Sequence, residues 1–140
     1  MDTLSEKCVI IIDESKPLGI MANIVSILSI SLGKLRPDIV GDNTPDKSGN
    51  SHYGLIQVPV PVLKASEDKI KELRNTLFDD NYSDVSCVDF SNVAQDCMTY
   101  EDYTNTMSNS GADDLVYMGL AIVGNKKKVN KLTGSLALLR

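Results

Sequence analysis

The sequence contains no tryptophan and a single histidine, and aromatic residues make up only 5% of its 140 residues. Its core must therefore be mainly aliphatic, since apolar residues still account for 42% of the chain. Charged residues make up 24%, and this balance is typical of a globular protein, not of a disordered one. We expect residues 1–140 to form a single domain.

Cysteine is also scarce, and its spacing excludes two classes of site. Cys8, Cys87 and Cys97 are odd in number and form no CxxC motif, so neither a disulfide framework nor a zinc site is indicated. Cys8 and Cys87 lie within apolar runs, where we expect them to be buried and reduced. Cys97 has no neighbouring histidine, and we do not expect it to be a nucleophile. The sequence predicts no metal site and identifies no cofactor.

Basic residues are missing from the middle of the chain. No lysine or arginine lies between Asn75 and Asn125, whereas nine carboxylates do. The chain then continues with a basic cluster: Lys126, Lys127, Lys128, Lys131 and Arg140. The net charge of −5 argues against a nucleic-acid partner. The basic cluster is either a solvated turn or an anion site, to which free N–H groups at a helix start would contribute.

Residues 8–33 form the most apolar part of the sequence. Residues 8–12 predict a buried strand, and residues 18–32 predict a helix, because no charge lies between Lys16 and Lys34. This helix is shorter than the roughly 20 residues that a bilayer requires, so we expect no membrane span. We expect it to be almost wholly buried, with its Ser and Asn face at a subunit contact or under the loop 34–59. A homo-oligomer such as a homodimer follows from this.

Periodicity predicts the remaining elements. We expect strands at residues 60–64, 85–90 and 115–123. Pro59 and Pro61 indicate either that the first of them lies at a sheet edge or that the prolines occupy its first residues. We expect helices after Ser66 as far as Phe78, at residues 100–107 and at residues 125–131. The loop 34–59 is either an active-site flap or contains short strands. Alternating strands and helices predict an α/β fold with helices on both faces of the sheet. The N-terminus lacks a signal-peptide pattern, and we expect a cytoplasmic protein.

The C-terminal segment 123–139 resembles the signature of type II peptidyl-tRNA hydrolases, in which a glycine turn, a helix ending in Thr-Gly and a Leu-x-Leu strand follow one another. More closely, residues 7–140 resemble an uncharacterised bacterial domain-of-unknown-function family, numbered two-thousand. Its pattern includes Asp13, Pro17, Gly19, Ala22, Asn23, His52, Gly54, Pro61, Leu63, Lys64, Val88, Asp89, Phe90, Thr99 and residues 129–134. This resemblance implies a three-layer α/β/α fold of the peptidyl-tRNA hydrolase II type, with a mixed sheet of about four strands. It implies no established activity.

The sequence departs from these hydrolases at two catalytic positions. Their first-helix glycine precedes a catalytic lysine, whereas Gly19 precedes Ile20, and their helix histidine aligns with about Ile27. An isoleucine cannot polarise a scissile ester, so we expect no peptidyl-tRNA hydrolase activity. Asp89 remains, with Asn23 as its neighbour from the helix. Its carboxylate is either a general base or a cap for the turn that follows it.

Two functions are compatible with these residues. The first is binding of a small polar or anionic molecule in a crevice at the strand ends, where α/β sheets usually bind ligands. The residues that we expect to bind it are Asp13, Gly19, Asn23, Asn125, Lys128 and Lys131. Lys131 would be the strongest contact. The alternative is hydrolysis of a small ester or amide by Asp89 and His52, because histidine alone has an unperturbed pKa near neutrality. A purely structural subunit is a third interpretation.

Overall fold

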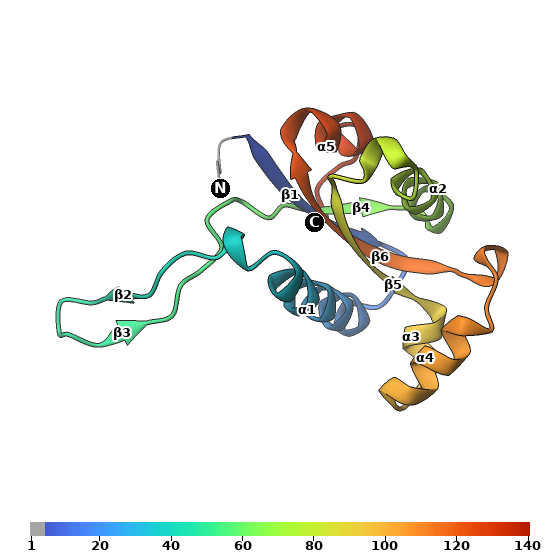
Figure 1. Cartoon of the computed structure of the whole chain (residues 1–140), viewed down its shortest axis with the longest axis horizontal. Coiled ribbons are helices and arrows are strands. Elements are labelled where there is room, and N and C mark those ends of the chain that lie inside the picture. Colours follow the sequence, from blue (N-terminus) through green and yellow to red (C-terminus); the bar gives the residue numbers. More distant parts are fainter. Residues whose placement is uncertain (1–4) are drawn as a thin grey trace.

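A mixed sheet in the order β4-β1-β6-β5 organises the fold of the computed structural model, which describes residues 5–140 (Figure 1). Its strands are β1 (Glu6–Asp13), β4 (Val62–Ala65), β5 (Ser86–Ser91) and β6 (Tyr117–Asn125). β1 and β4 are parallel, whereas β6 runs antiparallel to both β1 and β5. The predicted four-stranded mixed sheet is therefore confirmed, with the proline-flanked strand β4 at an edge.

Residues 5–140 form five α-helices around this sheet: α1 (Leu18–Leu35), α2 (Glu67–Leu77), α3 (Asn92–Asp96), α4 (Tyr100–Ser108) and α5 (Lys126–Thr133). α1 lies against one face, and α2 and α5 lie against the other (Figure 1). As predicted, Ser66 caps α2 by accepting a hydrogen bond from the Lys69 backbone N–H at 3.2 Å. The apolar stripe of α2 ends at Leu77, however. Phe78, at which the helix was predicted to end, is the C-cap residue one position beyond it and is exposed.

The apolar side chains of β1 point alternately to the two faces of the sheet, and this explains why helices pack on both faces. Successive side chains of a strand point to opposite faces, so a continuous apolar run produces two cores. Cys8, Ile10 and Ile12 pack with the α1 residues Ile24 and Leu28. On the other face, Val9 and Ile11 pack with the α2 residues Ile70 and Leu73 and the α5 residues Val129 and Leu132.

The prediction that the first helix is almost wholly buried is wrong for the single chain. Only Ile24, Leu28 and Leu32 of α1 are buried, whereas Leu18 and Ile30 are 78% and 76% exposed. The reason is that the sheet covers one face of the helix, and no other element within residues 5–140 buries the opposite face. Within residues 5–140, α1 is the one helix long and apolar enough to cross a membrane, a criterion that core helices also meet.

Residues 40–57, which we call the arm, form a narrow hairpin that projects from the body of the molecule (Figure 1). The arm contains β2 (Thr44–Pro45) and β3 (Ser51–His52), so the interpretation of the loop as short strands is confirmed. Two glycines meet at its base, where a side chain on Gly54 would overlap the carbonyl oxygen of Gly41. The Gly41 N–H donates to the Leu55 carbonyl at 2.9 Å and closes the hairpin.

The three cysteines are free: Cys8 is buried, and Cys87 and Cys97 are half-buried. Burial raises the pKa of Cys8 to about 11 and that of Cys87 to about 12. At pH 8 the thiolate fraction of each should therefore be about a thousandth or less. We expect Ellman's reagent to modify one thiol, Cys97, rapidly in the native protein and all three after denaturation. Rapid modification of two or three thiols in the folded protein would contradict this prediction.

Candidate functional site

The sheet topology divides the predicted ligand crevice between two ends of the molecule. Because β6 runs antiparallel to β1, Asn125 lies opposite Glu6, at the first residue of β1. Asp13 is the last residue of β1, about 23 Å away at roughly 3.3 Å per residue. The sequence-based crevice placed both residues around one ligand, and the structure does not bring them together.

Asp13 closes the connection between β1 and α1. Its carboxylate is buried and accepts hydrogen bonds from the Ser15 backbone N–H at 2.9 Å and the Ser15 hydroxyl at 2.7 Å. Gly19 and Asn23 lie on the exposed side of α1. These three predicted ligand-binding residues therefore lie at the start of α1, and none of them lines a described cavity.

The two predicted catalytic residues are in separate parts of the structure. Asp89 lies in β5, where its Oδ2 accepts a hydrogen bond from Arg74 Nε of α2 at 2.7 Å. His52 lies on the arm, and its Nε2 is 2.8 Å from Asp46 Oδ2 of the same hairpin. The arm projects away from β5 (Figure 1). Asp89 is thus neither paired with His52 nor a cap for the next turn, because its partner is a guanidinium.

The backbone N–H groups at the start of α5 are not available to bind an anion. Asn125 caps the helix, and its Oδ1 accepts from the N–H groups of Lys127 at 3.0 Å and Lys128 at 3.4 Å. The Lys126 N–H donates to the Ser5 carbonyl at 2.9 Å. The N–H groups that the sequence analysis expected to be free are therefore occupied. Any anion here must be held by side chains.

Two of the predicted lysines are also poorly placed to bind a ligand. Lys128 Nζ donates to the Asn81 carbonyl at 2.7 Å and to Asp84 Oδ1 at 2.8 Å, and this contact lowers the pKa of Asp84. Lys131 is exposed and lines none of the described cavities. The predicted ranking of the lysines, with Lys131 first, is not supported by this arrangement.

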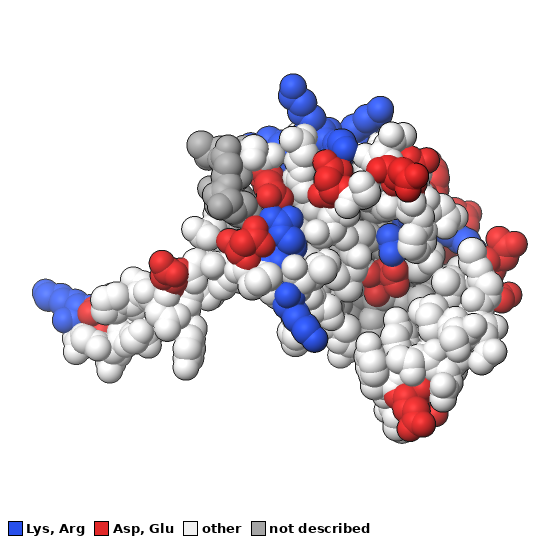
Figure 2. Space-filling view, viewed as in Figure 1, with Lys and Arg blue, Asp and Glu red and all other residues white. Residues whose placement is uncertain are grey.

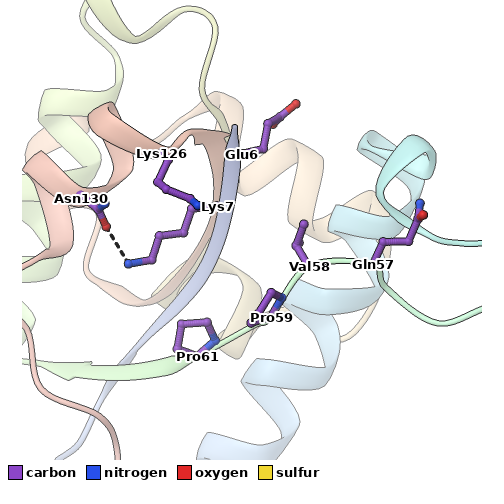
Figure 3. A pocket seen from close by; sticks show the side chains of 8 residues that line it. All are labelled: Glu6, Lys7, Gln57, Val58, Pro59, Pro61, Lys126 and Asn130. Carbon is purple, nitrogen blue, oxygen red and sulfur yellow. Dashed lines mark hydrogen bonds between the residues drawn. The ribbon is translucent and has the colours of Figure 1, made fainter. Parts of the chain in front are cut away.

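A cavity of about 370 Å³ lies beside the start of α5, between β1 and the segment that leads from the arm to β4 (Figure 3). Its lining residues are Glu6, Lys7, Gln57, Val58, Pro59, Pro61, Lys126 and Asn130. Lys7 Nζ donates to Asn130 Oδ1 at 2.6 Å. In Figure 3 Glu6 and Gln57 point away from this pair, and the two prolines lie opposite it. The polar groups of the cavity are therefore gathered on the side of α5.

The cavity has a net positive charge because Glu6, its one carboxylate, pairs with an arginine outside the cavity. Glu6 pairs with Arg36 at 2.9 Å, and Arg36 also pairs with Asp38 at 2.7 Å. Hydrogen bonds to Asp38 and Glu6 hold the pKa of Arg36 above its usual range. In the described part of the chain, by contrast, no carboxylate lies within ion-pair distance of Lys7 or Lys126.

A second hollow continues from this cavity across the start of α5. Its volume is about 380 Å³, and Ser5, Asn125, Lys126, Lys127 and Asn130 line it. Basic side chains project at this end of the molecule, with carboxylates on the neighbouring surface (Figure 2). Asn130 faces both hollows and, because its oxygen accepts from Lys7, its amide nitrogen remains a donor.

Of the predicted binding residues, Asn125 lines the second hollow, whereas the sequence-based prediction did not select Lys7 or Asn130. The signal for Lys7 was its place in the strand, where it alternates with the buried Cys8 and shares a face with Val9 and Ile11. The signal for Asn130 was weaker, since only the fold brings α5 beside β1. Among residues 5–140, no cluster of three or more potential metal ligands occurs.

Comparison with known proteins identifies a family and a fold. The model of the family described as "Protein of unknown function (DUF2000)" matches residues 6–140. No curated protein matches the sequence. A solved structure of a protein of unknown function, Atu0240 from Agrobacterium tumefaciens strain C58, superposes with a TM-score of 0.85. The two chains are 16% identical, and the match covers 97% of this chain and 98% of the other, so the likeness shows a shared fold. With nearly its whole length matched by the family model, the chain belongs to the DUF2000 family.

Proposed function

We propose that this protein binds a small anionic ligand, a carboxylate or a single phosphate, in the cavity between Lys7, Lys126 and Asn130. The observation that carries the proposal is the pair of lysines that line this cavity without a carboxylate partner among the described residues. A volume of about 370 Å³ lies within the range of small-molecule sites. The cavity is too small for a long polyanion, which agrees with the net charge of −5.

The donors of the cavity favour an anion over a neutral ligand. Lys7 uses one of its three ammonium donors on Asn130 and retains two, and Lys126 contributes a second ammonium. The hydrogen bond from Lys7 also fixes the Asn130 side chain with its amide N–H₂ group as the available donor. Val58, Pro59 and Pro61 provide an apolar wall that can contact the carbon skeleton of an organic anion.

We also infer a relation to the type II peptidyl-tRNA hydrolase fold without the corresponding activity, in a cytoplasmic protein. The fold relation is supported by the sequence pattern at residues 123–139. The lack of activity is supported by Ile20, which replaces the catalytic lysine, and by Asp89, whose carboxylate is held by Arg74. A hydrolase that used Asp89 and His52 together has no support in this geometry, because each side chain has a different partner.

Replacing Lys7 or Lys126 with Gln should weaken binding of inorganic phosphate or acetate about tenfold, which corresponds to about 1.4 kcal/mol. The reason is the loss of one charged donor, and binding should also weaken as the salt concentration rises. Amide chemical shifts during titration with each anion measure the affinity and locate the site. Lys131→Gln is the matched control on the same helix, and we expect its affinity to change less than twofold.

Unchanged affinity in a Lys7→Gln/Lys126→Gln double variant would refute this site. An equal loss in Lys131→Gln would show a general charge effect and would likewise refute it. Thermal unfolding provides a second readout, because a ligand that binds only the native state must raise the midpoint.

A further inference from the structure

One face of α1 consists of small residues at regular spacing. Gly19, Ala22, Ser26, Ser29 and Gly33 recur every three and four residues, which aligns them along the helix. Four of the five are exposed, and they lie on a different face from the buried Ile24, Leu28 and Leu32. Small side chains in this arrangement let the backbone of a second helix approach closely.

Large apolar residues border this stripe. Leu18 lies at one side, and Ile27 and Ile30 lie at the other, all exposed in the single chain. No charge interrupts the surface between Lys16 and Lys34. Exposed apolar side chains gathered on one face of a helix are typical of a protein contact.

The arm is the second unpartnered element. A two-stranded hairpin alone is at best marginally stable in water, and Tyr53 and Leu55 of the arm are 87% and 81% exposed. Its shape is nevertheless defined, because Asp46 accepts hydrogen bonds from the N–H groups of Ser48 at 2.9 Å and Asn50 at 3.1 Å. Figure 1 shows that the arm projects away from α1 and from the body of the molecule and does not fold back on its own chain.

We propose that a second copy of this chain covers both elements. The two α1 helices cross at their small-residue stripes on a twofold axis near Ser26, the central member of the stripe, and each arm reaches the partner. A twofold interface requires one surface to be complementary to itself, and a stripe of small residues bordered by larger ones meets this requirement. The lysines of the anion site, Lys7 and Lys126, lie on β1 and at the start of α5, outside both α1 and the arm.

The area that a stable dimer needs explains why the arm belongs to the interface. An 18-residue helix is about 27 Å long and about 10 Å wide, so its outer face projects roughly 270 Å². A standard interface buries about 800 Å² on each partner. α1 alone is therefore too small, and the arm carries the exposed apolar residues that can extend the contact.

Charges at the rim are complementary as well. Lys34 ends the uncharged surface of α1, and no carboxylate lies in the sequence between Glu14 and Asp38. The arm carries Asp42 and Asp46 against a single Lys47.

A membrane is a poorer occupant of this surface than a second copy of the chain. α1 is held to the sheet by its buried residues, and a chain with a net charge of −5 is repelled by anionic lipids.

Sedimentation equilibrium of the full chain and its variants tests the proposal. We expect the wild type to have twice the 15.2 kDa mass of the chain, and Ile30→Glu and Leu55→Glu to weaken association at least tenfold. Met98→Glu is the matched control, because Met98 is 94% exposed and lies between α3 and α4. Circular dichroism checks that each variant folds. A monomeric wild type, or a dimer unaffected by both variants, would overturn the proposal.

A cysteine at the proposed axis tests the geometry. Under mild oxidation Ser26→Cys should form a disulfide-linked dimer, whereas Ser108→Cys on α4 should not. Failure of Ser26→Cys to cross-link, or equal cross-linking of both variants, would overturn the crossing at Ser26. Flotation with phosphatidylcholine–phosphatidylserine vesicles should leave the protein unbound, and capture by the vesicles would overturn the assignment to a second copy.

Discussion

Leu28→Ala should lower the free energy of unfolding by about 3 kcal/mol, because it removes a wholly buried side chain and leaves a cavity between α1 and the sheet. The Leu28 side chain lies directly over Gly119 of β6, where a Cβ would be only 3.1 Å from Leu28 Cδ1. The helix and the central strand are thus fitted to each other at this point, and little relaxation can fill the space. Urea denaturation measures the change.

Met98→Ala is the control for this prediction. Its side chain is almost fully exposed, so the same loss of apolar atoms should change the free energy of unfolding by less than about 0.5 kcal/mol. Equal effects of the two substitutions would show that α1 does not depend on the contact at Leu28 for its attachment.

The helix α1 shows what an apolar sequence does and does not determine. The β-branched run before it and the lack of charge within it predicted a strand and a helix, and both are present. The same apolarity suggested that the helix is buried on nearly all sides. The composition of the helix indicates which side chains would be stabilised by burial. The arrangement of the layers determines which of them are buried, and within residues 5–140 these are Ile24, Leu28 and Leu32.

Strand direction explains the divided site. The local pattern of residues 115–123 predicts a central strand equally well for either direction, because side-chain alternation is the same in both. The pairing of the two strands in the structure, in which Asn125 lies opposite Glu6, shows that β6 is antiparallel to β1. That pairing moves the basic turn away from Asp13 and places it beside Lys7. The cavity could therefore not be assembled from sequence spacing, although the basic turn itself could be recognised.

Asp89 illustrates a different limit of prediction from the sequence. The sequence identified it as the remaining polar group of a hydrolase pattern, and the fold gives it a partner from a distant segment. Its side chain is 19% exposed, and the paired Arg74 side chain is 13% exposed. The Arg74 guanidinium also lies 3.7 Å from the centre of the Phe78 ring. Burial, and then the Asp89 carboxylate, raise the pKa values of Tyr103 and Tyr117.

Arg74→Met should therefore lower the free energy of unfolding by about 2–3 kcal/mol. Breaking a buried pair costs about 3–5 kcal/mol, and the residual exposure of both groups reduces this figure. The Arg74→Met/Asp89→Leu double variant should recover much of the loss, because no buried charge remains unpaired. A double-mutant cycle in urea measures the coupling. Lys69→Met is the control, since the exposed Lys69–Glu72 pair at 3.5 Å should contribute less than about 0.5 kcal/mol.

The same variants distinguish a structural Asp89 from a catalytic one. If the role of Asp89 is structural, Asp89→Asn should lower the free energy of unfolding by an amount similar to Arg74→Met. The reason is that the guanidinium is then left partly buried without its counter-charge. A general base would behave in the opposite way, since its amide variant would keep the fold and lose turnover of small esters. Intact stability together with lost ester hydrolysis in Asp89→Asn would therefore refute the structural role. The short contact to Arg74 and the separate pairing of His52 with Asp46 both favour the loss of stability.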